Sequence, residues 1–129
     1  MATTTANIRA LRPWSNGAMT FSKLENLLGS RLHRNFGCNT TIERESDSTI
    51  IVRYHGNTIA RYWQDGLVYL TNAGWYTSTT KERLNSLGAS IYQKNWVWYE
   101  ASGEGEPWTP GFYRISPSTG VLNRVQEVR

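Results

Sequence analysis

Apolar and aromatic residues gather in three short runs between residues 49 and 71, and residues that favour tight turns separate the runs. Gly56-Asn57 follows the first run, and Asp65-Gly66 follows the second. Such dipeptides between alternating segments are typical of β-hairpins. The pattern therefore predicts a three-stranded antiparallel meander, with strands at residues 49–55, 58–63 and 67–71.

Successive side chains of a strand point to opposite faces of its sheet. Ile51 and Arg53 therefore share one face of the first predicted strand. In the second strand, the shared face holds Ile59, Arg61 and Trp63. Neither face of the meander is wholly polar, so we expect a helix to cover one face. The other face should present aromatic and basic side chains.

Two segments, residues 22–34 and 79–87, carry leucines at the three- and four-residue spacing of amphipathic helices. A Ser or Thr three positions before a Glu forms a capping box, which starts a helix. Both segments begin with such a pair, at Ser22/Glu25 and Thr79/Glu82. Gly29 lies inside the first segment, where it weakens a helix by about 1 kcal/mol relative to Ala.

Shorter patterns complete the predicted sheet. They are a strand at 39–45, a hairpin of 90–94 and 97–100 around Asn95-Trp96, a late strand at 112–115, and an edge strand or tail at 121–128. Residues 101–111 are rich in Gly, Pro and Glu, a composition that predicts a loop.

Together these elements predict the α+β class: an antiparallel β-sheet of about five strands, packed by one longer and one short α-helix. The leucines of both helices should form the core with Ile51, Ile59 and Leu70. We expect residues 21–129 to form a single domain. Residues 1–20 should form an N-terminal arm, with Ile8, Leu11 and Trp14 as candidate anchors.

Composition adds a surplus of aromatic rings. The 129-residue chain holds six Trp and seven Tyr, more than a core of this size easily hides, so some rings should face solvent, a cleft or a partner. The formal net charge is +4, which permits nucleic acid or an acidic protein surface as partner and requires neither. No apolar run approaches the roughly 20 residues that span a bilayer, so we expect no membrane partner.

The single cysteine, Cys38, excludes an internal disulfide and favours a reducing compartment. A nucleophilic pair of Cys38 with His33 or His55 has no supporting motif around it. A lone cysteine is more often a small buried apolar residue than a nucleophile. The sequence therefore gives little support to cysteine catalysis.

Three carboxylates, Glu43, Glu45 and Asp47, alternate along a predicted strand and its turn. That spacing could gather them for metal binding or acid–base chemistry. A charged edge that resists pairing with another chain is the commoner meaning. We therefore predict no catalytic residues, no metal site and no cofactor, and hence a protein that is not an enzyme.

Basic and aromatic residues interleave along the meander and the segments that follow it. Arg and Lys neutralise phosphate while rings stack on bases, as in proteins that hold single strands. Trp, Tyr and Arg also dominate the energetics of protein interfaces. The candidate contact residues are Arg53, Arg61, Trp63, Trp75, Lys81, Arg83, Trp96 and Trp98.

From Thr40 to Tyr99 the chain resembles a family of small bacteriophage proteins of unassigned function. The segments that carry the resemblance are Ile51–Ala60, Asp65–Leu70, Gly74–Thr77, Thr79–Asn85, Ile91–Lys94 and Val97–Tyr99. The resemblance implies a viral gene that is expressed in the cytoplasm of a host bacterium. It brings no catalytic residues with it.

The resemblance, the surplus aromatics and the missing catalytic set predict a phage-encoded, non-enzymatic binding protein. Its partner would be a host or phage protein, for example a host defence complex such as CRISPR–Cas. Two alternatives stay open from the sequence: an accessory protein that binds single-stranded nucleic acid, and a minor capsid or decoration component of the virion.

Overall fold

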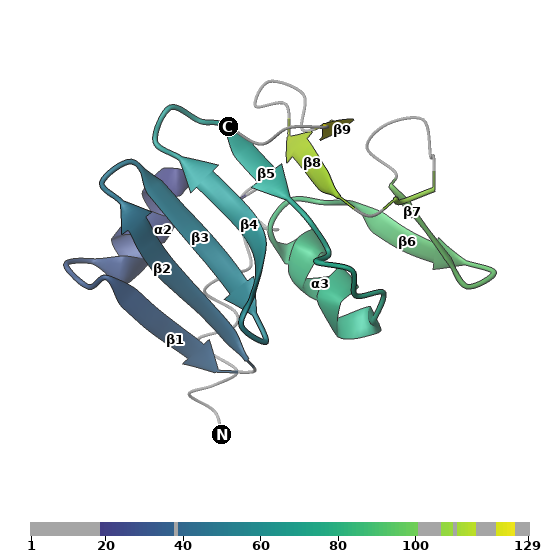
Figure 1. Cartoon of the computed structure of the whole chain (residues 1–129), viewed down its shortest axis with the longest axis horizontal. Coiled ribbons are helices and arrows are strands. Elements are labelled where there is room, and N and C mark those ends of the chain that lie inside the picture. The colour runs from purple at the N-terminus through teal and green to yellow at the C-terminus, as the bar shows by residue number, and fades with distance from the viewer. Residues whose placement is uncertain (1–18, 38, 101–106, 110, 116–120, 126–129) are drawn as a thin grey trace.

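The computed structural model describes residues 19–37, 39–100, 107–109, 111–115 and 121–125 (Figure 1). In chain order its elements are α2 (Phe21–Leu28), β1 (His33–Gly37), β2 (Thr40–Ser46), β3 (Thr49–Tyr54), β4 (Asn57–Trp63), β5 (Val68–Leu70), α3 (Ser78–Ser86), β6 (Ile91–Lys94), β7 (Val97–Glu100), β8 (Phe112–Ile115) and β9 (Leu122–Val125). Residues 1–18 of the predicted N-terminal arm, with the candidate anchors Ile8, Leu11 and Trp14, and also Cys38 lie outside the described residues.

Antiparallel pairing organises these strands into one large sheet and one hairpin. The large sheet has seven strands in the order β1-β2-β3-β4-β5-β8-β9, and β6 pairs with β7 separately. The α+β class and the central meander are therefore confirmed. The predicted number of about five strands is too low, because β1 and β9 extend the sheet at its two edges.

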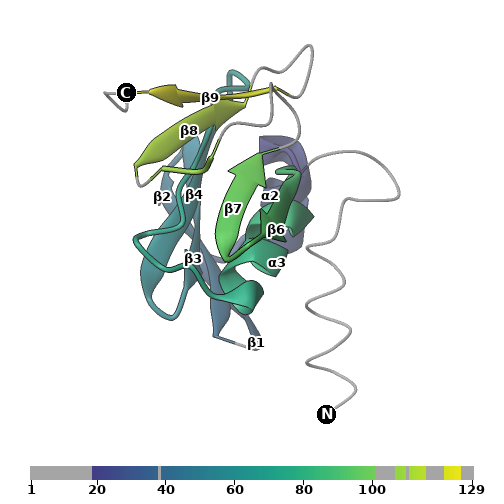
Figure 2. The same ribbon diagram turned by 90° about the vertical axis from the view of Figure 1, so that its right-hand side faces the viewer.

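Both helices and the β6–β7 hairpin lie on the same face of the large sheet (Figure 2). The core forms between them, from leucines of α2 and α3, Ile59 and Leu70 of the sheet, and Trp98 of the hairpin. Tyr62 is fully buried at this junction, and its hydroxyl donates a hydrogen bond to the Leu87 carbonyl at 3.3 Å. Burial raises the pKa of the Tyr62 phenol far above its usual range.

A bulge in β4 changes which side chains face the core. Val52 of β3 lies opposite Ala60, whereas Arg53 lies opposite Thr58, so Ile59 is the extra residue. Ile59 and Ala60 both join the core as a result. The prediction that Ile59 shares a face with Arg61 and Trp63 is therefore wrong, because it assumed unbroken alternation.

Ile51 is buried, but it does not belong to the core under the helices. Its register partners are Glu43 on β2 and Arg61 on β4, so it lies on the opposite face of the sheet. The predicted core position of Ile51 is therefore wrong. Charged neighbours in the same cross-strand row cover this isoleucine instead of a helix.

The first helix is shorter than predicted. It ends at Leu28, since Gly29 follows with a positive φ of 62° that a residue without a Cβ adopts at little cost. Leu32 is 69% exposed rather than part of a helical stripe, and the next residues pair as β1. Gly29 inside the leucine pattern was the signal for this ending.

Both helices also begin slightly earlier than the capping boxes predict. Thr20 caps α2, where its Oγ1 accepts a hydrogen bond from the Lys23 amide at 3.2 Å. Thr77 caps α3 in the same way, through the Thr80 amide at 3.2 Å. Each helix therefore uses the threonine two positions before the predicted cap.

Truncating Leu84 to alanine should destabilise the fold by about 2–5 kcal/mol, because this fully buried side chain joins α3 to the core. The control is Leu32→Ala, which removes the same atoms from an exposed site and should change stability by less than about 0.5 kcal/mol. Urea denaturation of both variants checks the pair. Equal losses would show that α3 is not packed as described.

Candidate binding surfaces

The face of the sheet away from the helices carries two of the predicted arginines, each in an ion pair. Arg53 Nη2 lies 3.3 Å from Glu43 Oε2, and Arg61 Nη1 lies 2.8 Å from Glu45 Oε1. Two of the three carboxylates considered for metal chemistry are thus paired with guanidinium groups. Positive charge on this part of the face is compensated locally, which weakens its attraction for phosphate.

Rings on the same face are also engaged with one another. Trp63 meets Tyr69 edge-to-face at 5.4 Å between ring centroids, and the Arg61 guanidinium lies 5.9 Å from the Trp63 ring. Trp63 is only partly exposed. Contacts within the sheet therefore account for much of this predicted Arg–aromatic set.

The two predicted basic residues of α3 differ in exposure. Lys81 is half-buried on the helix surface. Arg83 is 9% exposed, and its Nε donates a hydrogen bond to Thr40 Oγ1 at 3.0 Å. Its guanidinium also lies 5.6 Å from the Tyr54 ring, so Arg83 links α3 to the sheet from inside.

The β6–β7 hairpin holds two predicted tryptophans in opposite environments. Trp98 is 2% exposed and packs edge-on against Tyr76 and Trp108. Trp96 is 92% exposed at the hairpin tip, where the hairpin extends away from the large sheet (Figure 1). The stacked pair of Tyr92 and Tyr99 stiffens the strands behind the tip, with ring centroids 5.4 Å apart.

Backbone geometry makes Trp96 an unusual turn residue. Lys94 pairs with Val97, so Asn95 and Trp96 form a two-residue loop, with φ angles of 52° and 67°. Two positive φ angles define a type I′ turn, whose second position favours glycine. A bulky side chain there is rare and strained, and such strain tends to occur at functional sites.

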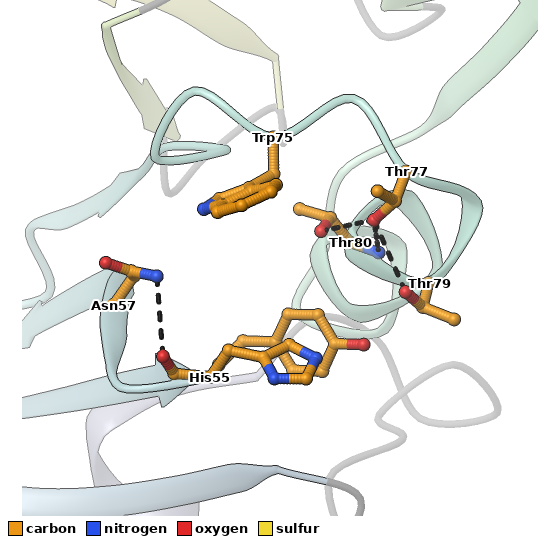
Figure 3. A pocket seen from close by; sticks show the side chains of 7 residues that line it. His55, Asn57, Trp75, Thr77, Thr79 and Thr80 are labelled. Carbon is orange, nitrogen blue, oxygen red and sulfur yellow. Dashed lines mark hydrogen bonds between the residues drawn. The ribbon is translucent and has the colours of Figure 1, made fainter.

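The exposed Trp75 lines a pocket of about 320 Å³ at one end of the sheet (Figure 3). The loop after β5 supplies Trp75, and the tight turn after β3 supplies the opposite wall. The first turn of α3 closes the side with three threonines. The lining residues are Tyr54, His55, Asn57, Trp75, Thr77, Thr79 and Thr80.

Of these lining residues, only Trp75 was singled out as a contact residue from the sequence. The connectivity could have found the others. In an antiparallel meander, the turns after the first and third strands lie at the same end of the sheet. The His55-Gly56 turn and the segment that carries Trp75 follow those two strands, so their proximity was open to prediction.

In the described part of the chain, no group of three His, Cys, Asp or Glu side chains lies close enough together to hold a metal ion. Neither of the described helices has the length and apolar character needed to cross a bilayer.

One comparison with known proteins gives a match. The family model described as Kyanoviridae Gp96 protein matches residues 28–114, which is more than half of the chain. The matched region contains the central meander, the pocket and the β6–β7 hairpin. No curated protein and no solved structure matches.

Replacing Trp96 with glycine should stabilise the protein by about 0.5–1 kcal/mol. The left-handed conformation costs a non-glycine residue about 1–2 kcal/mol, and glycine avoids this cost. Glycine also has more conformational entropy in the unfolded chain, which offsets about 0.4–1 kcal/mol of the gain. Trp96→Ala is the control, since alanine keeps the backbone strain and should bring no gain. Urea denaturation measures both. A loss of stability in the glycine variant would show that the ring supports the fold.

Proposed function

The chain belongs to the Kyanoviridae Gp96 family, a family of bacteriophage proteins, and we propose that it is a non-enzymatic binding protein of the infected bacterium. The observation that carries this proposal is the 92% exposed Trp96 at the tip of a projecting hairpin. The partner is a protein of the host or of the phage, reached in the host cytoplasm. A defence complex such as CRISPR–Cas is one such partner class.

The physical support begins with what an exposed tryptophan does at an interface. A Trp that enters a pocket of a partner removes a large apolar surface from water, and Trp is among the residues that most often dominate binding energy. Leaving such a ring in solvent, on a strained turn, has no benefit for folding. Both features suit a residue that is buried only in a complex.

The hairpin also holds the backbone that carries this ring in a defined place. Trp98, two residues after Trp96, anchors the hairpin in the core. The Tyr92–Tyr99 stack holds the two strands of the hairpin together. A rigid projection loses little conformational entropy on binding. Around the tip, Gln93, Lys94 and Asn95 are exposed, so a hydrophobic pocket with an acidic or polar rim would complement it.

The sheet face gives weaker support to single-stranded nucleic acid as the partner. Arg53 and Arg61, the two cations on which that alternative most depends, face Glu43 and Glu45. Binding of a single strand there would require phosphate to compete with these carboxylates. The hairpin tip, by contrast, presents the Trp96 ring almost wholly to solvent.

Tagged protein captured from infected-cell lysate should retain a discrete partner protein after nuclease treatment. Trp96→Gly should weaken that complex about tenfold or more, because an anchor of this kind contributes about 2 kcal/mol or more. The control is Leu32→Gly. It also removes an exposed apolar side chain, but one that precedes β1 and is distant in sequence from the hairpin.

Two results would contradict the proposal. One is a partner that Trp96→Gly retains as firmly as the wild-type protein does. The other is enrichment that disappears with nuclease, which would assign the interaction to nucleic acid. Quantifying this protein itself in purified phage particles separates a virion component from a protein that acts only in the cell.

A further inference from the structure

We propose that the pocket between Trp75 and His55 binds a nucleobase, carried either by a free nucleotide or by a single-stranded nucleic acid. This site is separate from the hairpin tip and does not depend on the function proposed for Trp96.

Aromatic rings form two opposite walls of the pocket. Figure 3 shows the Trp75 ring on one side and the His55 ring on the other, with open space between them. The His55 ring in turn packs edge-on against Tyr54, with ring centroids 4.4 Å apart. Rings on two sides favour a flat occupant, and every nucleobase offers two π-faces for stacking.

A buried asparagine holds the Trp75 wall in place. Asn72 is fully buried, and its Nδ2 donates a hydrogen bond to the Trp75 carbonyl at 3.0 Å. Its Oδ1 accepts one from the Gly74 amide at 3.3 Å, and its backbone carbonyl accepts one from the Trp75 amide at 2.9 Å. Ala73 and Gly74 both have positive φ, which fixes a tight turn.

The opposite wall is held by the β3–β4 turn. His55 and Gly56 have φ angles of 53° and 79°, the signature of a type I′ turn. The His55 amide also donates a hydrogen bond to the Asn39 carbonyl at 2.8 Å. Hydrogen-bonded turns therefore carry both ring walls. Stacking a ligand between the rings requires little ordering of the protein backbone.

Hydroxyl and amide groups supply the polar side of the pocket. Thr77 Oγ1 lies 3.3 Å from Thr79 Oγ1 and 2.8 Å from Thr80 Oγ1, which forms a hydroxyl cluster beside the rings. Hydroxyls both donate and accept, as the edges of bases require. Among the described residues, those that line the pocket include no Asp, Glu, Lys or Arg, so the pocket favours an uncharged ring rather than a charged group.

The volume sets the size of the occupant. About 320 Å³ lies at the lower end of the range for small-molecule sites, roughly 300–1,000 Å³. A single base or nucleoside is of the appropriate size, and a sugar–phosphate group attached to it would extend into solvent at the open mouth. The net charge of +4 favours the approach of such an anionic carrier.

Nuclear magnetic resonance titration of the full chain tests the site. The probes are adenosine, guanosine, cytidine and uridine monophosphates, and homopolymeric single-stranded DNA. At least one probe should shift the Trp75 indole and His55 ring signals. Trp75→Ala should weaken that binding about tenfold or more, because stacking on one ring typically contributes this much. Trp75→Phe should retain most of it.

Leu32→Ala is the control, since it removes an exposed apolar side chain outside the pocket and should leave the affinity unchanged. Equal affinity for a mononucleotide and for the oligomer of its base identifies a free nucleotide as the source. Much tighter binding of the oligomer identifies a single strand. Preserved backbone spectra of Trp75→Ala and Trp75→Phe show that the variants fold.

Three outcomes would overturn the proposal: no probe shifts the Trp75 signals, Trp75→Ala and Leu32→Ala weaken binding equally, or glucose displaces the nucleotide from the pocket. None of these outcomes affects the hairpin proposal, whose test depends on Trp96→Gly and a protein partner. Failure of the two proposals is therefore distinguishable.

Discussion

The large sheet buries one face under helices and a hairpin, and the rest of the structure depends on how that face is covered (Figure 2). The β4 bulge adds Ile59 to this face, and Tyr62 ties it to the end of α3. Because the β6–β7 hairpin is part of the cover, Trp98 must point inward. The same constraint places the hairpin tip, and with it Trp96, away from the core.

Covering the sheet in this way also assembles the pocket. The chain leaves β5 at the end of the sheet where the β3–β4 turn lies, and it must cross that end to begin α3. Trp75 lies on this crossing, and the cap of α3 follows two residues later at Thr77. Packing of α3 through Leu84 thus fixes one wall of the pocket relative to the other.

Local strain coincides with the exposed rings in both places. Among the described non-glycine residues, positive φ angles occur at His55, Ala73, Asn95 and Trp96, and also at Asn39, whose carbonyl binds the His55 turn. The preference for glycine at positive φ is violated at positions that expose a side chain to solvent instead of burying it. The strain is compensated by neighbouring bonds, such as those of Asn72, and by packed rings, such as Trp98.

Sequence reasoning identified the elements better than their boundaries and faces. Turn dipeptides located the meander, and leucine spacing located both helices, because these signals are local. The Ile59 bulge escaped because simple alternation carries no sign of an inserted residue, and its cause lies in pairing with β3. The predicted contact residues include both buried and exposed side chains for a similar reason. The hairpin pattern placed Trp96 in the turn and Trp98 in a strand, but it did not show which strand face packs against the core, so both tryptophans were candidate contact residues.

The central claim is that the protein presents an exposed ring, on a hairpin anchored in the core, to a protein partner. Site-specific photocrosslinking in infected cells tests it most directly, with a photoreactive phenylalanine derivative at position 96 and, as control, at position 32. The account predicts one discrete protein adduct from position 96 and none from position 32. Adducts of equal yield from both positions, or none from position 96, would contradict it.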